Sequence, residues 1–288
     1  MTAAPVHVIG ASGRSGRRLC AALTAAGITP VPVVRNPTRW AATGLPGAPR
    51  LADLEQPAAL AAALVGATSL VCCAHARYAG AVLAAAPTGA RVVFLGSTRK
   101  FTRWRDDHAS GVLAGEAAFH AAGRPGVMLH PTMIYGAQGE DNVRRLAALL
   151  ARLPLVPLPG GGRALVQPIH QDDVTRAILA ALARPWTGPE SLVIAGPAPL
   201  TYADFVRAVA AAAGLPAPRI VAVPAAPLRA FAPLTRLLPF LPRVRSAELR
   251  RLTEDKAFDI APMQAALGFT PMPLATGLAR TFAVPHTA

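Results

Sequence analysis

The stretch Val6-His7-Val8-Ile9-Gly10-Ala11-Ser12-Gly13-Arg14-Ser15-Gly16 decides the fold, because it predicts a strand, a glycine turn and then a helix. A helix-compatible stretch follows it, from Arg17 to Ala26. Glycines at three-residue spacing let the backbone turn sharply, approach a pyrophosphate and pack the helix closely on the strand. Amides at the start of the helix would face the phosphates. A turn with only a structural role is the alternative, but the order of elements favours a dinucleotide site that includes Gly10, Ser12, Gly13, Arg14, Ser15 and Gly16.

The end of the second predicted strand, Val31–Val34, favours NADP(H) over NAD(H). Arg35 follows it about twenty residues past Gly16, where an NAD site usually has an acidic residue for the ribose hydroxyls. Arg35 and Arg39, with Arg14 as a third candidate, offer guanidinium groups whose planar donors suit a 2′-phosphate. Chance placement in an arginine-rich chain is the alternative.

Composition and charge limit the classes of function. The chain has 288 residues, is 52% hydrophobic and carries a formal net charge of +14, with Lys100 and Lys256 as its only lysines. It can bury a sizeable core, and its charge suits an anionic small-molecule substrate. Nucleic acid is not expected as a partner, because no recognition motif accompanies the charge. Without a signal-peptide pattern or an apolar run long enough to span a bilayer, the sequence predicts a cytoplasmic protein with no transmembrane segment.

The three cysteines, Cys20, Cys72 and Cys73, lack the spacing of metal ligands. They lie on elements that we expect to be buried. The sequence therefore predicts core residues and no metal site.

Strands and helices alternate through the first half of the chain. The pattern predicts further strands near Leu51 and at Ser69–Cys73, Arg91–Leu95 and Val127–His130, and helices at Pro57–Val65, Ala81–Ala86 and Ser110–Ala121. Such alternation builds an α/β fold with a doubly wound parallel sheet. We expect an NAD(P)-binding Rossmann domain over residues 1–135, to which a later segment at about 164–196 returns. A smaller mixed substrate region then makes up most of 136–288.

The second half begins with a predicted helix at Asp141–Leu153, the turn Pro159–Gly162 and a strand around Leu165–Ile169. Thr201 is expected to cap a further helix, with Asp204 three residues on in place of the usual Glu or Gln of a capping box. This feature is structural.

The segment Arg219–Arg251 combines apolar side chains with arginines, and Glu248 is its only acidic residue. It has two interpretations. A basic and apolar surface would contact an anionic lipid-linked or nucleotide-linked substrate, a membrane surface or a partner protein. Alternatively, a pair of amphipathic helices closes the small region, since Pro233, Pro239 and Pro242 prevent one long membrane helix.

Several motifs resemble the extended or atypical short-chain dehydrogenase/reductase superfamily over nearly the whole chain. Within it, the chain is similar to the nucleotide-binding accessory subunit of respiratory complex I and to bacterial NAD-dependent epimerase/dehydratase proteins. Besides the glycine turn, the motifs are Asp53-Leu54, Phe94-Leu95-Gly96-Ser97-Thr98, His130-Pro131-Thr132-Met133-Ile134-Tyr135-Gly136 and Gln167-Pro168-Ile169-His170-Gln171-Asp172-Asp173-Val174.

The resemblance implies roles for some of these residues. Asp53 and Leu54 would border the adenine, Ala74 the adjoining ribose, and the segment from Pro131 to Gly136 the nicotinamide. Tyr135 would pack and position its neighbours. Asp172 and Asp173 would orient the second region without taking part in chemistry.

The chain departs from the superfamily pattern at the catalytic residues. There, a Tyr-x-x-x-Lys pair works with a Ser or Thr to exchange a proton while the nicotinamide exchanges a hydride. Alignment through Glu116 places His108 at the tyrosine position and Val112 at the lysine position. His108 is either an acid or base near neutral pH or a solvated loop residue after Asp107. Ser97 is the other catalytic candidate, with simple strand termination as its alternative.

Two classes of function remain. One is an NADP(H)-dependent oxidoreductase or epimerase that acts on a small or a nucleotide- or lipid-linked metabolite. The other is a non-catalytic NADP(H)-binding protein that senses redox state or stabilises an assembly. The sequence favours the enzyme, because a basic second region predicts a ligand beyond the cofactor. It predicts neither the substrate nor the oligomeric state.

Overall fold

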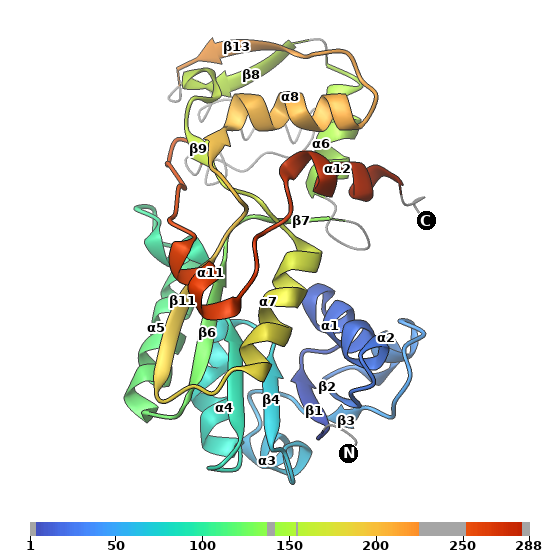
Figure 1. The fold of residues 1–288 in the computed structure, drawn as a ribbon, viewed down its shortest axis with the longest axis vertical. Helices are drawn as coiled ribbons and strands as arrows, with labels where there is room; N and C mark the ends of the chain where they lie inside the picture. The colour runs from blue at the N-terminus through green and yellow to red at the C-terminus, as the bar shows by residue number, and fades with distance from the viewer. Residues whose placement is uncertain (1–3, 137–141, 154, 225–251, 284–288) are drawn as a thin grey trace.

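The centre of the fold is a seven-stranded parallel sheet with the strand order β11-β6-β5-β4-β1-β2-β3 (Figure 1). The computed structural model describes residues 4–136, 142–153, 155–224 and 252–283. The predicted doubly wound sheet is confirmed. Its strands are β1 (Val6–Ile9), β2 (Pro30–Val34), β3 (Arg50–Leu51), β4 (Ser69–Cys72), β5 (Arg91–Leu95), β6 (Gly126–Pro131) and β11 (Pro189–Ile194).

Side chains of the sheet alternate between two cores, one on each face, as the two-residue period of a strand requires. Val8, Val93 and Leu129 belong to one core, with α1 (Arg14–Ala25), α2 (Pro37–Ala41), α7 (Gln171–Ala183) and α11 (Ala261–Leu267). Ile9, Phe94 and Met128 belong to the other, with α3 (Pro57–Ala63), α4 (Ala79–Ala85) and α5 (Asp107–Ala122). Both faces are therefore covered, which explains the nearly unbroken apolar character of the central strands.

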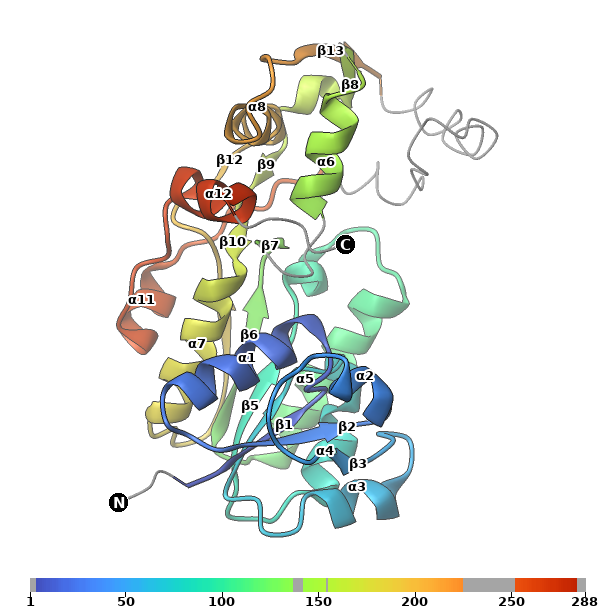
Figure 2. The same cartoon turned by 90° about the vertical axis from the view of Figure 1, so that its right-hand side faces the viewer.

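A second layer lies beyond one end of the large sheet and has a core of its own (Figures 1 and 2). Its helices are α6 (Asn142–Leu150), α8 (Tyr202–Ala212) and α12 (Leu274–Ala283). Its short strands pair as β7 (Ile134–Tyr135) with β10 (Ile169–His170), β9 (Leu165–Val166) with β12 (Leu200–Thr201), and β8 (Leu155–Pro159) with β13 (Arg219–Val223). Three single turns, η1 (Ala76–Tyr78), η2 (Thr98–Phe101) and η3 (Gly160–Gly162), complete the described elements.

Two details of the second region differ from the sequence predictions. The strand predicted around Leu165–Ile169 is two short strands, because Pro168 has no N–H and Gln167 turns its side chain to the carbonyl of Gly196, 2.8 Å away. The start of the segment Arg219–Arg251 is β13 and not a helix, while residues 225–251 lie outside the described residues. The predicted cap of α8 is confirmed, since the hydroxyl of Thr201 accepts the N–H of Asp204 at 3.0 Å. Among the described helices, none has the length and apolar content required to cross a membrane.

Candidate functional site

The glycine turn has the geometry of a phosphate-binding loop. Gly10 follows β1 with φ at 75°, and its carbonyl accepts the N–H of Gly13 at 2.9 Å. A Cβ on Gly16 would lie 2.2 Å from the oxygen of Gly10, so only glycine allows α1 to pack this closely. Gly13, the N-cap of α1, provides no side-chain cap, and the first turn has no acidic residue. The start of the helix therefore suits an anionic group such as a pyrophosphate.

The sheet topology places a switch point beside this turn, where a ligand crevice is expected. The strand order reverses between β1 and β4, where ligands of open α/β sheets bind beyond the carboxyl ends of the strands. A Cβ on Gly10 would lie 3.1 Å from the amide nitrogen of Ala74, which follows β4. The structure thus brings Gly10 and Ala74 together, as a site shared by the two strands requires.

The exposed Arg35 and Arg39 lie on either side of the start of α2. Asn36 caps this helix, because its side-chain oxygen accepts the N–H of Arg39 at 3.0 Å. Buried Trp40 anchors the helix through a 2.9 Å hydrogen bond from its indole N–H to the carbonyl of Gly47. The cap and the anchor together fix the backbone from which both guanidinium groups project.

Asp53 and Leu54 follow β3 at the same edge of the sheet and are half-buried. The carboxylate of Asp53 accepts the N–H of Glu55 at 3.1 Å, and Leu54 packs against the core beneath α3. These contacts stabilise the turn after β3. A role of either residue at the adenine stays a prediction.

Ser97, at the end of β5, is held by a histidine from the next strand. Its amide donates to Nδ1 of His130 at 3.2 Å, and its hydroxyl accepts the N–H of Arg99 at 3.2 Å. A Cβ on Gly96 would lie 2.4 Å from His130 Nδ1, so the glycine makes room for the ring. Thr98 donates its hydroxyl to the carbonyl of Pro131 at 3.1 Å. The backbone at Ser97 is thereby fixed on both sides.

Behind Ser97 lies a cluster of ionisable groups that the sequence analysis did not identify. Glu116 Oε1 is 2.5 Å from the ammonium of Lys100 and 3.2 Å from Nε2 of His130. Burial, assisted by the charge of Lys100, lowers the pKa of His130 to about 4 against the opposing effect of Glu116. Burial acts to raise the pKa of Glu116, but the hydrogen bond from Lys100 and further partners lower it overall. The lowered pKa values of His130 and Glu116 describe a neutral histidine beside a carboxylate that is paired with the Lys100 ammonium. No motif spacing predicts it, because its members come from η2, α5 and β6.

His108 is not a solvated loop residue. Helix α5 begins three residues before the predicted Ser110, because the carboxylate of Asp106 caps it by accepting the N–H of Ala109 at 2.9 Å. His108 therefore lies in the first turn of the helix, half-buried, with Nδ1 3.0 Å from Nε2 of His75. Val112, one turn further on, is buried in the core beneath the sheet.

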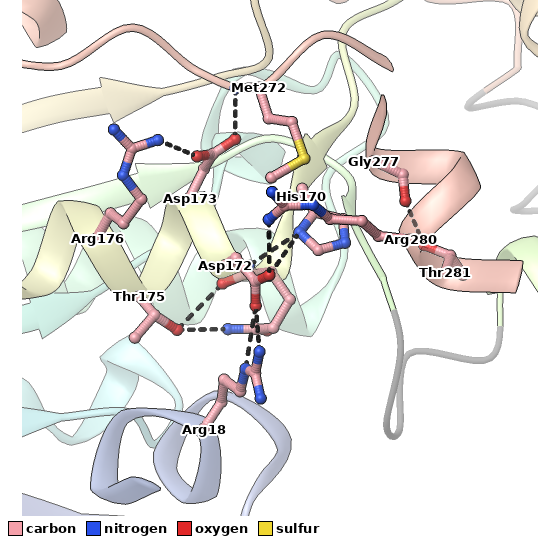
Figure 3. Close-up of polar contacts among 11 residues, drawn as sticks. Arg18, His170, Asp172, Asp173, Thr175, Arg176, Met272, Gly277, Arg280 and Thr281 are labelled. Carbon is pink, nitrogen blue, oxygen red and sulfur yellow. Dashed lines mark hydrogen bonds and ion pairs between the residues drawn. The ribbon is translucent and has the colours of Figure 1, made fainter. Parts of the chain in front are cut away.

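A junction of polar groups joins α1 to the second layer (Figure 3). Both Nε and one terminal nitrogen of Arg18 donate to a single oxygen of Asp172, at 3.0 and 2.7 Å. The other carboxylate oxygen of Asp172 is 3.9 Å from a guanidinium nitrogen of Arg280 on α12. Asp173, which is buried, accepts the N–H of Met272 at 2.7 Å. These contacts connect α7 to α1, to α12 and to the chain before α12, and an orienting role for the two carboxylates stays a prediction.

Comparisons with known proteins agree with this geometry. Residues 10–113 match the family model described as NAD(P)H-binding. A short-chain dehydrogenase/reductase superfamily protein from Agrobacterium tumefaciens with bound NAD is 18% identical, with 96% of this chain and 95% of that chain covered and a TM-score of 0.70. The chain has a Rossmann fold.

Two further structures have the same Rossmann fold. A nucleoside-diphosphate-sugar epimerase from Pseudomonas aeruginosa is 21% identical, with 97% and 96% of the two chains covered and a TM-score of 0.72. The NADPH-dependent quinone oxidoreductase QOR2 of Escherichia coli, complexed with NADPH, is 17% identical, with 96% and 99% covered and a TM-score of 0.75. These likenesses show the fold, and the family model over residues 10–113 supports NAD(P)H binding.

A longer protein contains a segment related to this Rossmann chain. The uncharacterized protein Rv2047c of Mycobacterium tuberculosis (strain ATCC 25618 / H37Rv) is 29% identical over 279 residues, which are 92% of this chain and 28% of that protein. The chain thus spans about a quarter of the length of the curated relatives it matches.

The other predicted residues of the Rossmann fold lie in packed surroundings. The hydroxyl of Ser15 donates to the side chain of Gln171 at 3.2 Å, so it faces α7. Tyr135 is buried against α12, where a Cβ on Gly277 would lie 2.1 Å from its hydroxyl oxygen. Burial raises the pKa of the Tyr135 hydroxyl, which suits packing better than proton exchange.

The cysteines of the Rossmann chain are core residues, as predicted. Cys20 and Cys72 are buried and Cys73 is half-buried. Burial raises the pKa of the Cys20 and Cys72 thiols to about 12, so these two are thiols and not reactive thiolates at neutral pH.

Proposed function

We propose that this protein is an NADP(H)-dependent oxidoreductase or epimerase-like enzyme that acts on a small or a nucleotide- or lipid-linked metabolite. The observation that supports the cofactor preference is the pair of arginines that follows β2. Exposed Arg35 and Arg39 lie on either side of the Asn36 cap, at the position where an NAD site usually has a carboxylate. Two guanidinium groups there favour a cofactor with a 2′-phosphate.

The residues of the crevice would divide the remaining work. A bound nicotinamide supplies hydride exchange with the substrate. The amides at the start of α1 would bind the pyrophosphate, and Ala74 would border the ribose. Ser97 and His108 would provide hydrogen bonds or a proton at the reacting oxygen, because each lies just beyond the carboxyl end of a central strand or on the helix that follows it.

The cofactor preference is tested by titrating the purified protein with NADPH and NADH, read by nicotinamide fluorescence. We expect tighter binding of NADPH, and we expect Arg35→Ala and Arg39→Ala each to weaken it by roughly ten- to hundredfold, the loss of one charge-assisted hydrogen bond. NADH binding should change by less than about threefold, since it lacks the phosphate. Arg91→Ala is the matched control, because Arg91 is exposed at the opposite end of β5. Equal affinity for both cofactors, unchanged by either substitution, would overturn the preference.

A second candidate function is a non-catalytic NADP(H)-binding protein. The observation that favours it is Val112, a buried aliphatic side chain at the position aligned with the superfamily lysine. Binding of NADPH without oxidation of the cofactor by carbonyl compounds would favour this candidate. In that case we expect NADPH and NADP⁺ to raise the thermal stability by different amounts, as a redox sensor requires.

A further inference from the structure

Two histidines from different elements meet beside the cofactor crevice. His75 directly follows Ala74 at the end of β4, and His108 lies in the first turn of α5. The nitrogens Nε2 of His75 and Nδ1 of His108 are 3.0 Å apart, and the two rings make an edge-on contact with centroids 4.4 Å apart. The distance and the ring arrangement describe a hydrogen bond between two imidazoles.

The backbone fixes the direction of that hydrogen bond. His75 is the N-cap of η1, and its Nδ1 accepts the N–H of Arg77 at 3.1 Å. A neutral imidazole that accepts at one nitrogen carries its proton on the other. His75 therefore donates from Nε2 to Nδ1 of His108. By the same rule, His108 carries its own proton on Nε2.

Two glycines of α5 leave the space that this histidine pair needs. A Cβ on Gly111, one turn after His108, would lie 2.8 Å from Cε1 of His75. A Cβ on Gly115, the next residue along that face of α5, would lie 1.9 Å from the carbonyl oxygen of Ala76. The two glycines let η1 press against the helix, which brings His75 within reach of His108.

Burial and nearby positive charge keep the donor neutral. Burial first, then His108, Arg77 and Arg99, lower the pKa of His75 to about 4. At neutral pH the His75 ring is thus uncharged. Protonation of Nδ1 would also break its hydrogen bond from Arg77.

We propose that His75 is a positioning residue for His108: it holds the His108 ring in place with the proton on Nε2, so that His108 meets the substrate oxygen as an N–H donor. The inference deepens the proposed function and rests on it for the presence of a substrate. In this arrangement the imidazole N–H of His108 takes the place of the tyrosine hydroxyl of the superfamily's Tyr-x-x-x-Lys pair. Such an N–H can stabilise negative charge that develops on a carbonyl oxygen. The geometry of the pair itself requires no ligand.

The test of the geometry is NMR of the full chain labelled with ¹⁵N-histidine, at pH 7.5 without ligands. Long-range ¹H–¹⁵N spectra separate the two neutral tautomers, and His108→Gln identifies the His108 signals by their absence. We expect one tautomer for His108, protonated on Nε2, with Nδ1 as a hydrogen-bond acceptor. A His108 ring that exchanges between tautomers, or one protonated on Nδ1, would overturn the proposal.

Two substitutions separate positioning from folding. His75→Asn keeps an N-cap side chain for η1 but removes the donor to His108. Gly111→Ala improves helix propensity and displaces His75, whereas the control Gly80→Ala adds a methyl group at an ordinary 3.5 Å from Ala118. We expect His75→Asn and Gly111→Ala to release the His108 ring into mixed tautomers, and Gly80→Ala to leave its spectrum as in the wild type. An unchanged His108 spectrum in His75→Asn contradicts the proposal.

The functional consequence is measured with NADPH and 9,10-phenanthrenequinone as a carbonyl probe. We expect His75→Asn to lower kcat by about tenfold with the KM for NADPH unchanged, because the ring that aids the reaction loses its orientation. His108→Gln, whose amide can donate, should retain more turnover than His108→Leu. Wild-type protein that binds NADPH but does not reduce the probe overturns the donor role and leaves cofactor binding intact. Failure to bind NADPH overturns the proposed function instead. The NMR measurement of the His108 tautomer then decides by itself whether His75 positions His108.

Discussion

At the scale of single residues, the glycines of the turn after β1 were the most predictable feature of the candidate site. Gly10 and Gly16 were identifiable because Gly10 has a left-handed backbone and a Cβ on Gly16 would lie 2.2 Å from the oxygen of Gly10. The pairing of His75 with His108 was not, because the two residues are 33 positions apart and meet only through the packing of η1 on α5. The same holds for Lys100, Glu116 and His130, whose shared position depends on three elements.

His130 makes stability depend on pH in a defined direction. Its pKa is about 4 in the folded chain, below the ordinary value of 6.5, so the unfolded chain binds more protons between these values. The free energy of unfolding therefore falls as the pH is lowered from about 6.5 toward 4, with His130 contributing at most about 3 kcal/mol. We expect His130→Asn to lose less stability than the wild type between pH 7 and pH 5 in urea denaturation. Equal losses would show that the other buried histidines carry the effect.

At the scale of elements, the alternation of apolar runs predicted the large sheet well, because parallel strands buried on both faces need apolar side chains throughout. The predicted ends of helices and strands were wrong where a capping or turning side chain, and not the hydrophobic pattern, sets the end of the element. Asp106 starts α5 early, and Gln167 with Pro168 divides a predicted strand in two. The pairing of β8 with β13 left no clear pattern, since β8 is rich in proline and most of β13 is exposed.

Helix α7 is the element that holds the chain after α11 in place, through buried Asp173. We expect Asp173→Ala to lower the free energy of unfolding by about 2–3 kcal/mol, because the N–H of half-buried Met272 loses its charged acceptor. Arg176→Ala removes the other partner of the same carboxylate, 2.9 Å away, but this arginine is exposed, so the cost should stay below about 1 kcal/mol. Urea denaturation measures both. Equal costs would mean that Arg176, through its ion pair and its position 4.4 Å from the centroid of the Phe269 ring, matters as much as the contact with Met272.

At the scale of the whole molecule, segments distant in sequence meet at the candidate site. The buried carboxylate of Glu254 accepts the hydroxyl of Thr102 at 2.7 Å and the N–H of Arg103 at 2.8 Å. The loop that follows Ser97 is thus tied to a residue about 150 positions later. No local pattern predicts such a tie, because each partner has unremarkable neighbours in sequence.

Removing this tie should loosen the loop. We expect Glu254→Ala to speed amide hydrogen exchange in residues 98–106 by about tenfold, because the local opening free energy falls by roughly one charge-assisted hydrogen bond. Asp259→Ala is the control, since its carboxylate caps the neighbouring N–H of Ala261 at 2.9 Å. Mass spectrometry of exchanged peptides measures both variants. An unchanged exchange rate in Glu254→Ala would show that η2, and not the contact with Glu254, keeps the loop ordered.

The two outer strands of the large sheet bear on how copies of this chain behave in a crowded solution. β3 has only two residues, and Arg50 on it directs its guanidinium to the carbonyls of Ala63 and Val65, at 3.0 and 2.8 Å. At the other side, β11 begins with Pro189, which has no N–H to offer, and continues with exposed Glu190. β3 is too short to template another molecule's strand, and Pro189 with the charged Glu190 makes the start of β11 a poor template. Both features make pairing between the sheets of two copies less favourable.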